Sequence, residues 1–133
     1  MNIKKLGLIA ASVAMLAGSV TNAAFADGHK NVKVGMITTL SGGGAGLGID
    51  VRDGFMLAVK QSKNSNIDVV IEDDQRKPDI AVQLADKMIQ SEKVDILTGI
   101  IWSNLAMAVV PAATAQGKFY LSPNAGPSPL AGK

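Results

Sequence analysis

The sequence predicts an α/β protein built on a doubly wound parallel sheet with helices on both faces. Two observations support this fold class. Short apolar runs alternate with longer segments of helical periodicity, and turns rich in glycine, proline or polar residues separate them. The resulting order is β-α-β-α-β-α-β. Strands that are short and almost wholly apolar are typical of a parallel sheet that helices cover on both sides.

The first half of the chain supplies two predicted strands and one helix. VKVGMIT, residues 32–38, alternates and then becomes apolar, which predicts a strand. A helix is expected from residue 49 to about residue 63, and Gly54 within it favours close packing onto the sheet. IDVVI, residues 67–71, is the next strand. The acidic residues after it are expected to form a solvated strand end: Glu72, Asp73 and Asp74.

The second half repeats the pattern. Pro78 suits the first turn of a helix, and apolar residues then recur every four positions, at Ile80, Leu84 and Met88. VDILTGII, residues 94–101, predicts a third strand with its loop. A third helix is expected over residues 105–115, where Pro111 should kink it or end its first half. KFYL, residues 118–121, predicts a short fourth strand.

The first 26 residues have the layout of a secretory signal peptide. Lys4 and Lys5 precede an apolar run, and Ala24-Phe25-Ala26 forms a small-residue cleavage site. The apolar run, residues 6–20, is about 15 residues long, whereas roughly 20 are needed to span a bilayer. We therefore expect an exported protein that does not insert into the membrane after cleavage.

Cleavage removes two of the 13 basic residues and no acidic one, so the 107 residues that remain carry 11 of each sign. The basic surface expected of a nucleic-acid-binding protein is therefore absent. The sequence has no cysteine and a single histidine, His29, near the new amino terminus. Neither a metal cluster nor a Ser-His-Asp triad can be assembled from this inventory. We expect no enzyme activity, no catalytic residue, no metal and no cofactor.

The glycine-rich stretch SGGGAGLG, residues 41–48, raises the question of phosphate binding. A P-loop requires Gly-Lys-Ser/Thr, but no basic residue lies between Lys33 and Arg52. The dinucleotide fingerprint fails too, because its third glycine would fall at Leu47, Ile49 or Val51. Two interpretations remain equally good: backbone N–H groups before a helix that suit a small anion, or a tight turn that needs unusual dihedrals.

Three loops are expected at one edge of the sheet. In doubly wound sheets, ligands bind outside the carboxyl ends of the strands. The loops expected there are residues 39–48, 101–104 and 122–126. Each has a simpler interpretation: Trp102 as a core residue, Asn104 as a helix cap, and Ser122-Pro123 as a turn. Together, three loops of small and polar residues at one edge predict a ligand cleft.

At this point the chain resembles a known family. VKVGMITTLSGGGAGLG, VVIEDDQRKPDIAVQLADKMI, VDILTGIIWSN and FYLSPNAG, in this order, are similar to the first half of the leucine/isoleucine/valine-type periplasmic binding proteins. Those proteins are the solute receptors of ABC importers for branched-chain amino acids, amides and related small acids. The resemblance covers residues 31–133. It implies one lobe of the type 1 periplasmic-binding fold, a periplasmic location, and the permease and ATPase of an importer as partners.

The resemblance also implies ligand-binding residues. The carboxylate-binding loop maps to Ser103 and the backbone of Asn104, and the residue that covers the ligand side chain maps to Leu47. Trp102 adds an aromatic wall, and Ser41 is a further candidate in the glycine-rich loop. The segment after the fourth strand maps to Asn124, Ala125 and Gly126. The serine run of the family is reduced here, and Gly126 replaces a frequent threonine. We therefore expect a small aromatic or aliphatic carboxylate as the ligand, with an amino acid as the alternative.

The family has two lobes, whereas this sequence ends soon after the fourth predicted strand. Residues 27–133 are therefore expected to be an incomplete amino-terminal lobe that is not competent alone. Two rival functions remain. An exported ligand-sensing module would share the fold. A nucleotide-using α/β enzyme would need a catalytic base and phosphate-binding cations near the glycine-rich loop, and the sequence offers neither.

Overall fold

The computed structural model of the chain describes residues 31–63 and 66–130. The predicted signal peptide and His29 lie outside these ranges. The elements follow the predicted order: β1 Val32–Thr38, α1 Ala45–Gln61, β2 Ile67–Asp73, α2 Pro78–Gln90, β3 Ile96–Thr98, α3 Ser103–Ala115, β4 Phe119–Leu121 and a 3-10 turn at Ser128–Leu130. Within the described ranges, no helix combines the length and apolar content that crossing a membrane requires.

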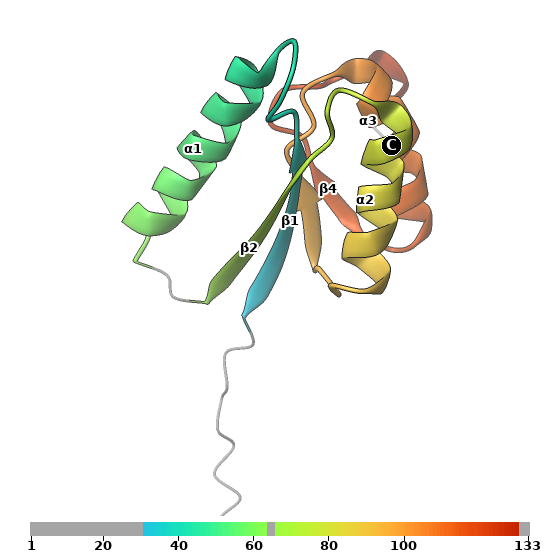
Figure 1. Cartoon of the computed structure of the whole chain (residues 1–133). Helices are drawn as coiled ribbons and strands as arrows, with labels where there is room; N and C mark the ends of the chain where they lie inside the picture. Colours follow the sequence, from blue (N-terminus) through green and yellow to red (C-terminus); the bar gives the residue numbers. More distant parts are fainter. Residues whose placement is uncertain (1–30, 64–65, 131–133) are drawn as a thin grey trace, which may run out of the picture.

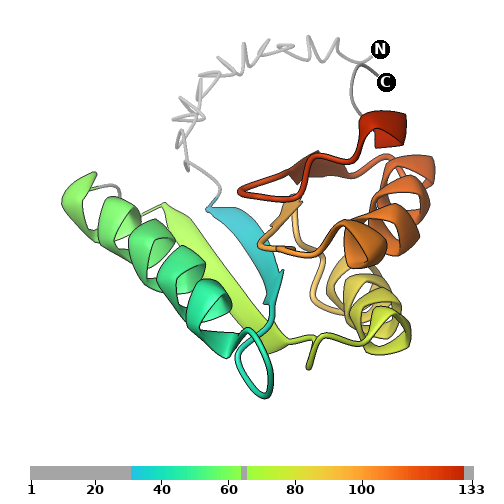
Figure 2. The same cartoon turned by 90° about the horizontal axis from the view of Figure 1, so that it is seen from above.

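The four strands form one parallel sheet in the order β2-β1-β3-β4. The chain therefore winds outward from β1 in both directions, which makes the carboxyl ends of β1 and β3 the switch point of the topology. α1 covers one face of the sheet, and α2 and α3 cover the other (Figures 1 and 2). The predicted doubly wound fold with helices on both faces is confirmed.

The hydrophobic core lies between the sheet and the helices α2 and α3. From α2 it takes Ala81, Ala85, Met88 and Ile89, and from α3 Leu105, Ala106, Val109 and Ala113. The strands contribute Ile37 and Leu97 on the same face. Gly35 lies opposite α2, where a Cβ would stand 2.7 Å from the Met88 sulfur. The absence of a side chain at Gly35 therefore lets α2 pack closely on β1.

The opposite face is packed differently. Gly48 is the one buried residue of α1, and a Cβ there would overlap the carbonyl oxygen of Thr39. Gly54, in contrast, is exposed and has open space around its Cβ position. The prediction that Gly54 mediates close packing is therefore wrong, because the helix approaches the sheet at its first turn.

Two helices begin earlier than predicted, α1 at Ala45 and α3 at Ser103. α3 also continues through Pro111 to Ala115, so the proline does not end the helix. Pro111 removes the N–H that would bond to the carbonyl of Met107. Because both residues are exposed, water can satisfy that carbonyl.

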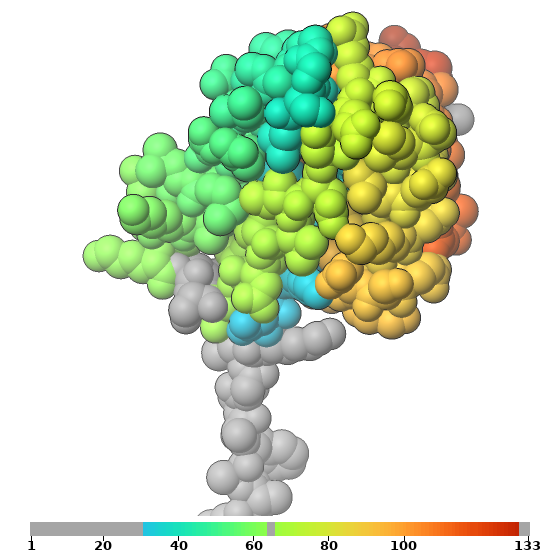
Figure 3. All heavy atoms as spheres, in the orientation of Figure 1, coloured from blue at the N-terminus to red at the C-terminus, as the bar shows by residue number. Residues whose placement is uncertain are grey.

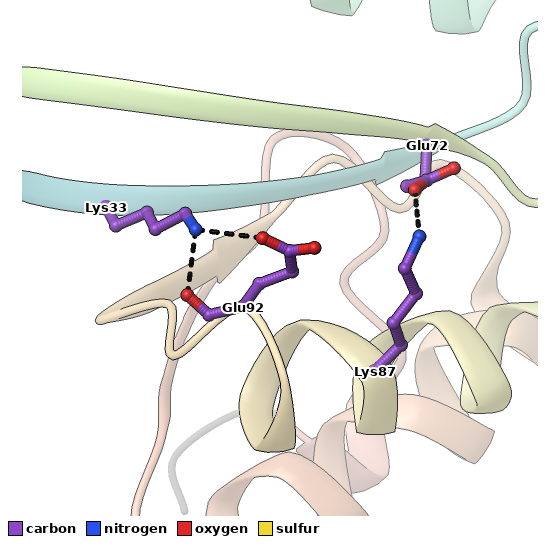
Figure 4. A network of polar contacts seen from close by, with 4 residues as sticks. All are labelled: Lys33, Glu72, Lys87 and Glu92. Atoms are coloured by element: carbon purple, nitrogen blue, oxygen red, sulfur yellow. Dashed lines mark hydrogen bonds and ion pairs between the residues drawn. The ribbon is translucent and has the colours of Figure 1, made fainter.

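Two ion pairs attach α2 to the sheet (Figure 4). Lys33 of β1 lies 2.9 Å from Glu92, just after α2, and Lys87 lies 2.7 Å from Glu72 of β2. The hydrogen bond from Lys33 lowers the pKa of Glu92, and the hydrogen bond to Glu72 raises the pKa of Lys87. All four side chains are partly exposed, so solvent screens these pairs and each contributes little to stability.

Candidate functional site

The structure brings the three predicted loops together at the carboxyl edge of the sheet. The indole Nε1 of Trp102, after β3, donates a 2.9 Å hydrogen bond to Oγ1 of Thr39, after β1. The amide Nδ2 of Asn124, after β4, donates a 3.0 Å hydrogen bond to the carbonyl of Ile101. The loop after β3 therefore lies between the other two and is bonded to both.

The glycine-rich loop packs against the edge of the indole. Gly42 and Gly44 have φ angles of 69° and 95°, which side-chain-bearing residues rarely adopt, and a Cβ at Gly44 would overlap the Trp102 ring. The tight-turn interpretation is confirmed at these two glycines. The N–H groups of Ala45 and Leu47 donate back to Gly42 and Gly44, at 3.3 and 3.1 Å, so they are engaged within the turn.

A fourth loop, between β2 and α2, also enters the site. The Arg76 guanidinium lies 3.9 Å from the centroid of the Trp102 ring, a cation–π contact. Its Nη1 also donates a 3.4 Å hydrogen bond to the carbonyl of Gly43. Figure 3 shows the glycine-rich loop and the β2–α2 loop side by side at the upper edge of the molecule. Sequence reasoning missed this loop.

Asp74 is fully buried, so the expectation of a solvated strand end is wrong for this residue. Its Oδ1 accepts a 2.6 Å hydrogen bond from the Thr39 hydroxyl and a 2.8 Å hydrogen bond from the N–H of Arg76. Asp74 is buried by the turn that follows it. In this turn Gln75 and Arg76 have positive φ angles, of 51° and 58°. A short acidic side chain before such a turn is the sequence signal for this arrangement.

The neighbouring Asp73 fixes the glycine-rich loop. Its Oδ1 accepts hydrogen bonds from the N–H groups of Leu40 and Gln75, at 2.8 and 2.9 Å. Partial burial acts to raise the pKa of Asp73, but the hydrogen bonds from Ser41, Leu40 and Gln75 outweigh it and hold the pKa below its usual value. Ser41, a predicted ligand contact, is exposed, and its hydroxyl bonds to Asp73.

The amino terminus of α3 is an exposed part of the site. The helix begins at Ser103 with Trp102 as the N-cap residue, and no side chain caps it. The interpretation of Asn104 as the cap is therefore wrong. Ser103 and Asn104 are both exposed. An uncapped helix start with an accessible hydroxyl suits a carboxylate, because the helix dipole is positive there.

The segment after β4 is a turn with mixed exposure. The Ser122 hydroxyl donates to the carbonyl of Ala125, which confirms the turn interpretation for Ser122. Ala125 is 5% exposed and its side chain belongs to the core, so only its backbone is at the edge. Asn124 and Gly126 are exposed. Leu47, expected to cover a ligand side chain, is 53% exposed on the first turn of α1.

Three residues of this segment, Ser122, Ala125 and Gly126, also line a separate cavity. This cavity, of about 350 Å³, lies between α3 and the carboxyl-terminal coil, and its walls include Val110, Tyr120, Ala125, Gly126 and Leu130. Trp102, Ser103 and Asn104 are not among its lining residues. Burial raises the pKa of the Tyr120 phenol on its wall, and the phenol oxygen accepts the N–H of Ile100 at 3.1 Å.

The groups at this edge of the sheet are of types that can bind a small ligand. Within the ranges that the structure describes, no three residues of the types histidine, cysteine, aspartate and glutamate form a group that could hold a metal ion. The site offers hydroxyl and amide groups, a helix amino terminus, an indole and one guanidinium. Such a set can fix a small anion and pack against an apolar group.

A profile of the family described as "Periplasmic binding protein" matches residues 31–133. No curated protein matches the sequence.

Solved structures provide further comparisons. An ABC transporter solute binding protein from Rhodopseudomonas palustris, in complex with benzoate, is 38% identical over 72% of this chain, with a TM-score of 0.68. One from R. palustris BisB5, in complex with 3,4-dihydroxy benzoic acid, is 29% identical over 72%, with a TM-score of 0.69. The branched-chain amino acid transporter substrate binding protein of Streptococcus pneumoniae, in complex with isoleucine, is 27% identical over 74%, with a TM-score of 0.69. This chain spans 28%, 28% and 30% of their respective lengths.

Proposed function

Because the chain belongs to the periplasmic binding protein family, we propose that residues 27–133 form the amino-terminal ligand-binding lobe of a solute receptor that serves an ABC importer. One observation carries the proposal: the loops after β1, β2 and β4 all contact Ile101 or Trp102, beside the uncapped start of α3. This is where a doubly wound sheet binds its ligand. Export to the periplasm by a cleaved signal peptide, residues 1–26, is part of the same proposal.

The ligand that we propose is a small carboxylate, preferably aromatic. Ser103 and the start of α3 would hold the carboxylate, and Trp102 would pack against the ring. The solute binding protein that is 38% identical is in complex with benzoate, which supports this choice. The charged side chain on Trp102 is the cation Arg76, which favours an anion over a zwitterion.

A branched-chain amino acid is the second candidate, supported by the Streptococcus pneumoniae protein in complex with isoleucine. Its ammonium group needs an acceptor. Neither carboxylate beside the site offers one, because Asp73 already accepts hydrogen bonds from Leu40 and Gln75 and Asp74 is fully buried. The carboxylate ligand is therefore the better fit to the described side chains.

The proposed ligand is tested by calorimetric titration of the chain with benzoate and, separately, with isoleucine. Ser103→Ala should weaken benzoate binding roughly tenfold, the size of one hydrogen bond to a charged group. Ser91→Ala is the matched control, because Ser91 is exposed after α2, at the opposite end of the strands. Equal affinities for Ser103→Ala and Ser91→Ala would show that the carboxylate binds elsewhere.

The proposed partners are the permease and the ATPase of an importer. They follow from family membership and are tested separately from the ligand. Stimulation of ATP hydrolysis by the reconstituted importer on addition of the ligand-loaded receptor would support transport. A receptor that instead changes the activity of a sensor kinase would support the sensing module.

A further inference from the structure

Asp74 lies at the centre of a buried chain of hydrogen bonds that ends on Trp102. Its Oδ1 accepts from the Thr39 hydroxyl at 2.6 Å, and the Thr39 oxygen accepts from the indole Nε1 at 2.9 Å. The same Oδ1 accepts from the N–H of Arg76 at 2.8 Å. One carboxylate oxygen therefore restrains both the ring and the residue whose guanidinium stacks on it.

Fold stability alone does not account for this arrangement. Among the residues that the structure describes, neither the buried second oxygen of Asp74 nor the buried hydroxyl of Thr38 has a hydrogen-bond partner. Unpartnered buried polar atoms are unfavourable and uncommon. The turn that brings Arg76 over the ring also places two consecutive residues, Gln75 and Arg76, at positive φ, which costs backbone energy. These costs are concentrated around one indole at the carboxyl edge of the sheet.

The three restraints on the indole are complementary. An indole has a single N–H donor, and its bond to Thr39 sets the rotation of the ring. Gly44 leaves room for the ring edge, since any side chain there would overlap it. Arg76 covers one ring face at 3.9 Å. Thr39 and Arg76 both depend on Asp74, whereas Gly44 does not.

We propose that Asp74 is a positioning residue that fixes the Trp102 ring through Thr39 and holds Arg76 against that ring, so that the aromatic wall is formed before a ligand arrives. The inference rests on the proposed function of the edge as a ligand site. A wall that is already ordered removes an entropic cost from binding.

Trp102 is the only tryptophan of the sequence, so fluorescence excited at wavelengths that tyrosine does not absorb reports on it alone. The test compares Thr39→Val with Thr38→Val in the full chain. The two threonines are adjacent and both 0% exposed. Thr39 connects Asp74 to the indole, whereas the Thr38 hydroxyl has no partner within the described ranges. Both substitutions keep the shape of the side chain and remove one hydroxyl.

We expect Thr39→Val to shift the Trp102 emission to the red and to raise the acrylamide quenching constant roughly twofold, because the ring loses its partner and gains access to solvent. Thr38→Val should leave both readouts at the wild-type value. Asp74→Ala should behave as Thr39→Val does, and Asp74→Asn, which keeps an oxygen acceptor, should restore the wild-type emission. If Asp74→Ala does not fold, the two threonine variants decide the question.

Equal quenching constants for Thr39→Val and Thr38→Val would overturn the proposal. A benzoate titration of the same proteins tests the proposed function separately from the positioning role of Asp74. If wild type binds benzoate, Thr39→Val should bind it roughly fivefold more weakly, the size of one hydrogen bond. If wild type does not bind benzoate, the lobe is not competent alone or the proposed ligand is wrong, while the quenching contrast still decides whether Asp74 positions the ring.

Discussion

The two faces of the sheet bury their apolar residues to very different extents. On the face covered by α2 and α3, Leu97, Leu105 and Val109 are all 0% exposed. On the α1 face, Met36 of β1 is 0% exposed, but Phe119 and Leu121 of β4 are 63% and 51% exposed. The residue types are similar, so hydrophobicity does not explain the difference.

The difference follows from strand register and helix placement. Leu97 pairs with Tyr120, and because side chains alternate along a strand, Phe119 and Leu121 point to the other face. α2 and α3 both pack on the face of the sheet that carries Leu97 and Tyr120. The other face is covered by α1 alone, which lies beside β1 and β2 and away from β4 (Figure 2). An apolar residue is buried here only where a helix lies above its strand.

The largest expected effect is on the core face. Leu105→Ala should lower the free energy of unfolding by about 2–5 kcal/mol, because it opens a cavity between α3 and the sheet. Leu57→Ala on α1 removes the same atoms from an exposed position and should change it by less than about 0.5 kcal/mol. Urea unfolding of the two variants measures the contrast. Similar losses would mean that Leu57 is buried as Leu105 is.

The α1 face has one tightly packed point, and glycine variants along α1 locate it. Gly48→Ala should destabilise the chain by about 1–3 kcal/mol, because the new methyl group meets the Thr39 backbone. Gly54→Ala has open space and should stabilise the helix by roughly 0.5–1 kcal/mol. Thermal unfolding distinguishes the opposite signs. A stabilising effect of Gly48→Ala would show that α1 does not approach the sheet there.

The exposed apolar residues of β4 should influence association more than stability. Phe119→Ser is expected to reduce self-association in sedimentation experiments, because Phe119 and Leu121 form an exposed apolar pair. Its effect on unfolding should stay within roughly 0.5 kcal/mol. Met107→Ser, at an exposed position of α3, is the control and should leave association unchanged. A large loss of stability on Phe119→Ser would show that β4 is covered on this face.

The smallest expected effect concerns the loop that leads into α1. The folded pKa of Asp73 is below its usual value of 3.8. Its carboxylate therefore contributes stability above that value, and the contribution is lost as the pH falls through the folded pKa. Asp73→Asn should weaken the acid dependence of unfolding, measured by urea titrations at successive pH values below neutrality. Asp50→Asn, on the exposed side of α1, provides the comparison, and an identical acid dependence in both variants would contradict the assignment.

Local patterns predicted the elements and the edge at which the loops meet. The alternation in residues 32–38 and the fourfold spacing of Ile80, Leu84 and Met88 correctly gave β1 and α2. The strand order placed Trp102 beside the glycine-rich loop, as expected. Gly54 was assigned the wrong role, because helical periodicity does not show which turn of a helix touches the sheet.

The sequence by itself determined the fold class, the order of the elements, the absence of cysteine chemistry and the three loops that were expected at one edge. Tertiary structure decided that Asp74 is buried and that Arg76 stacks on the indole. The physical reason is the separation along the chain. Thr39 and Trp102 are 63 residues apart, and a hydrogen bond across that distance exists only because β1 and β3 are neighbours in the sheet.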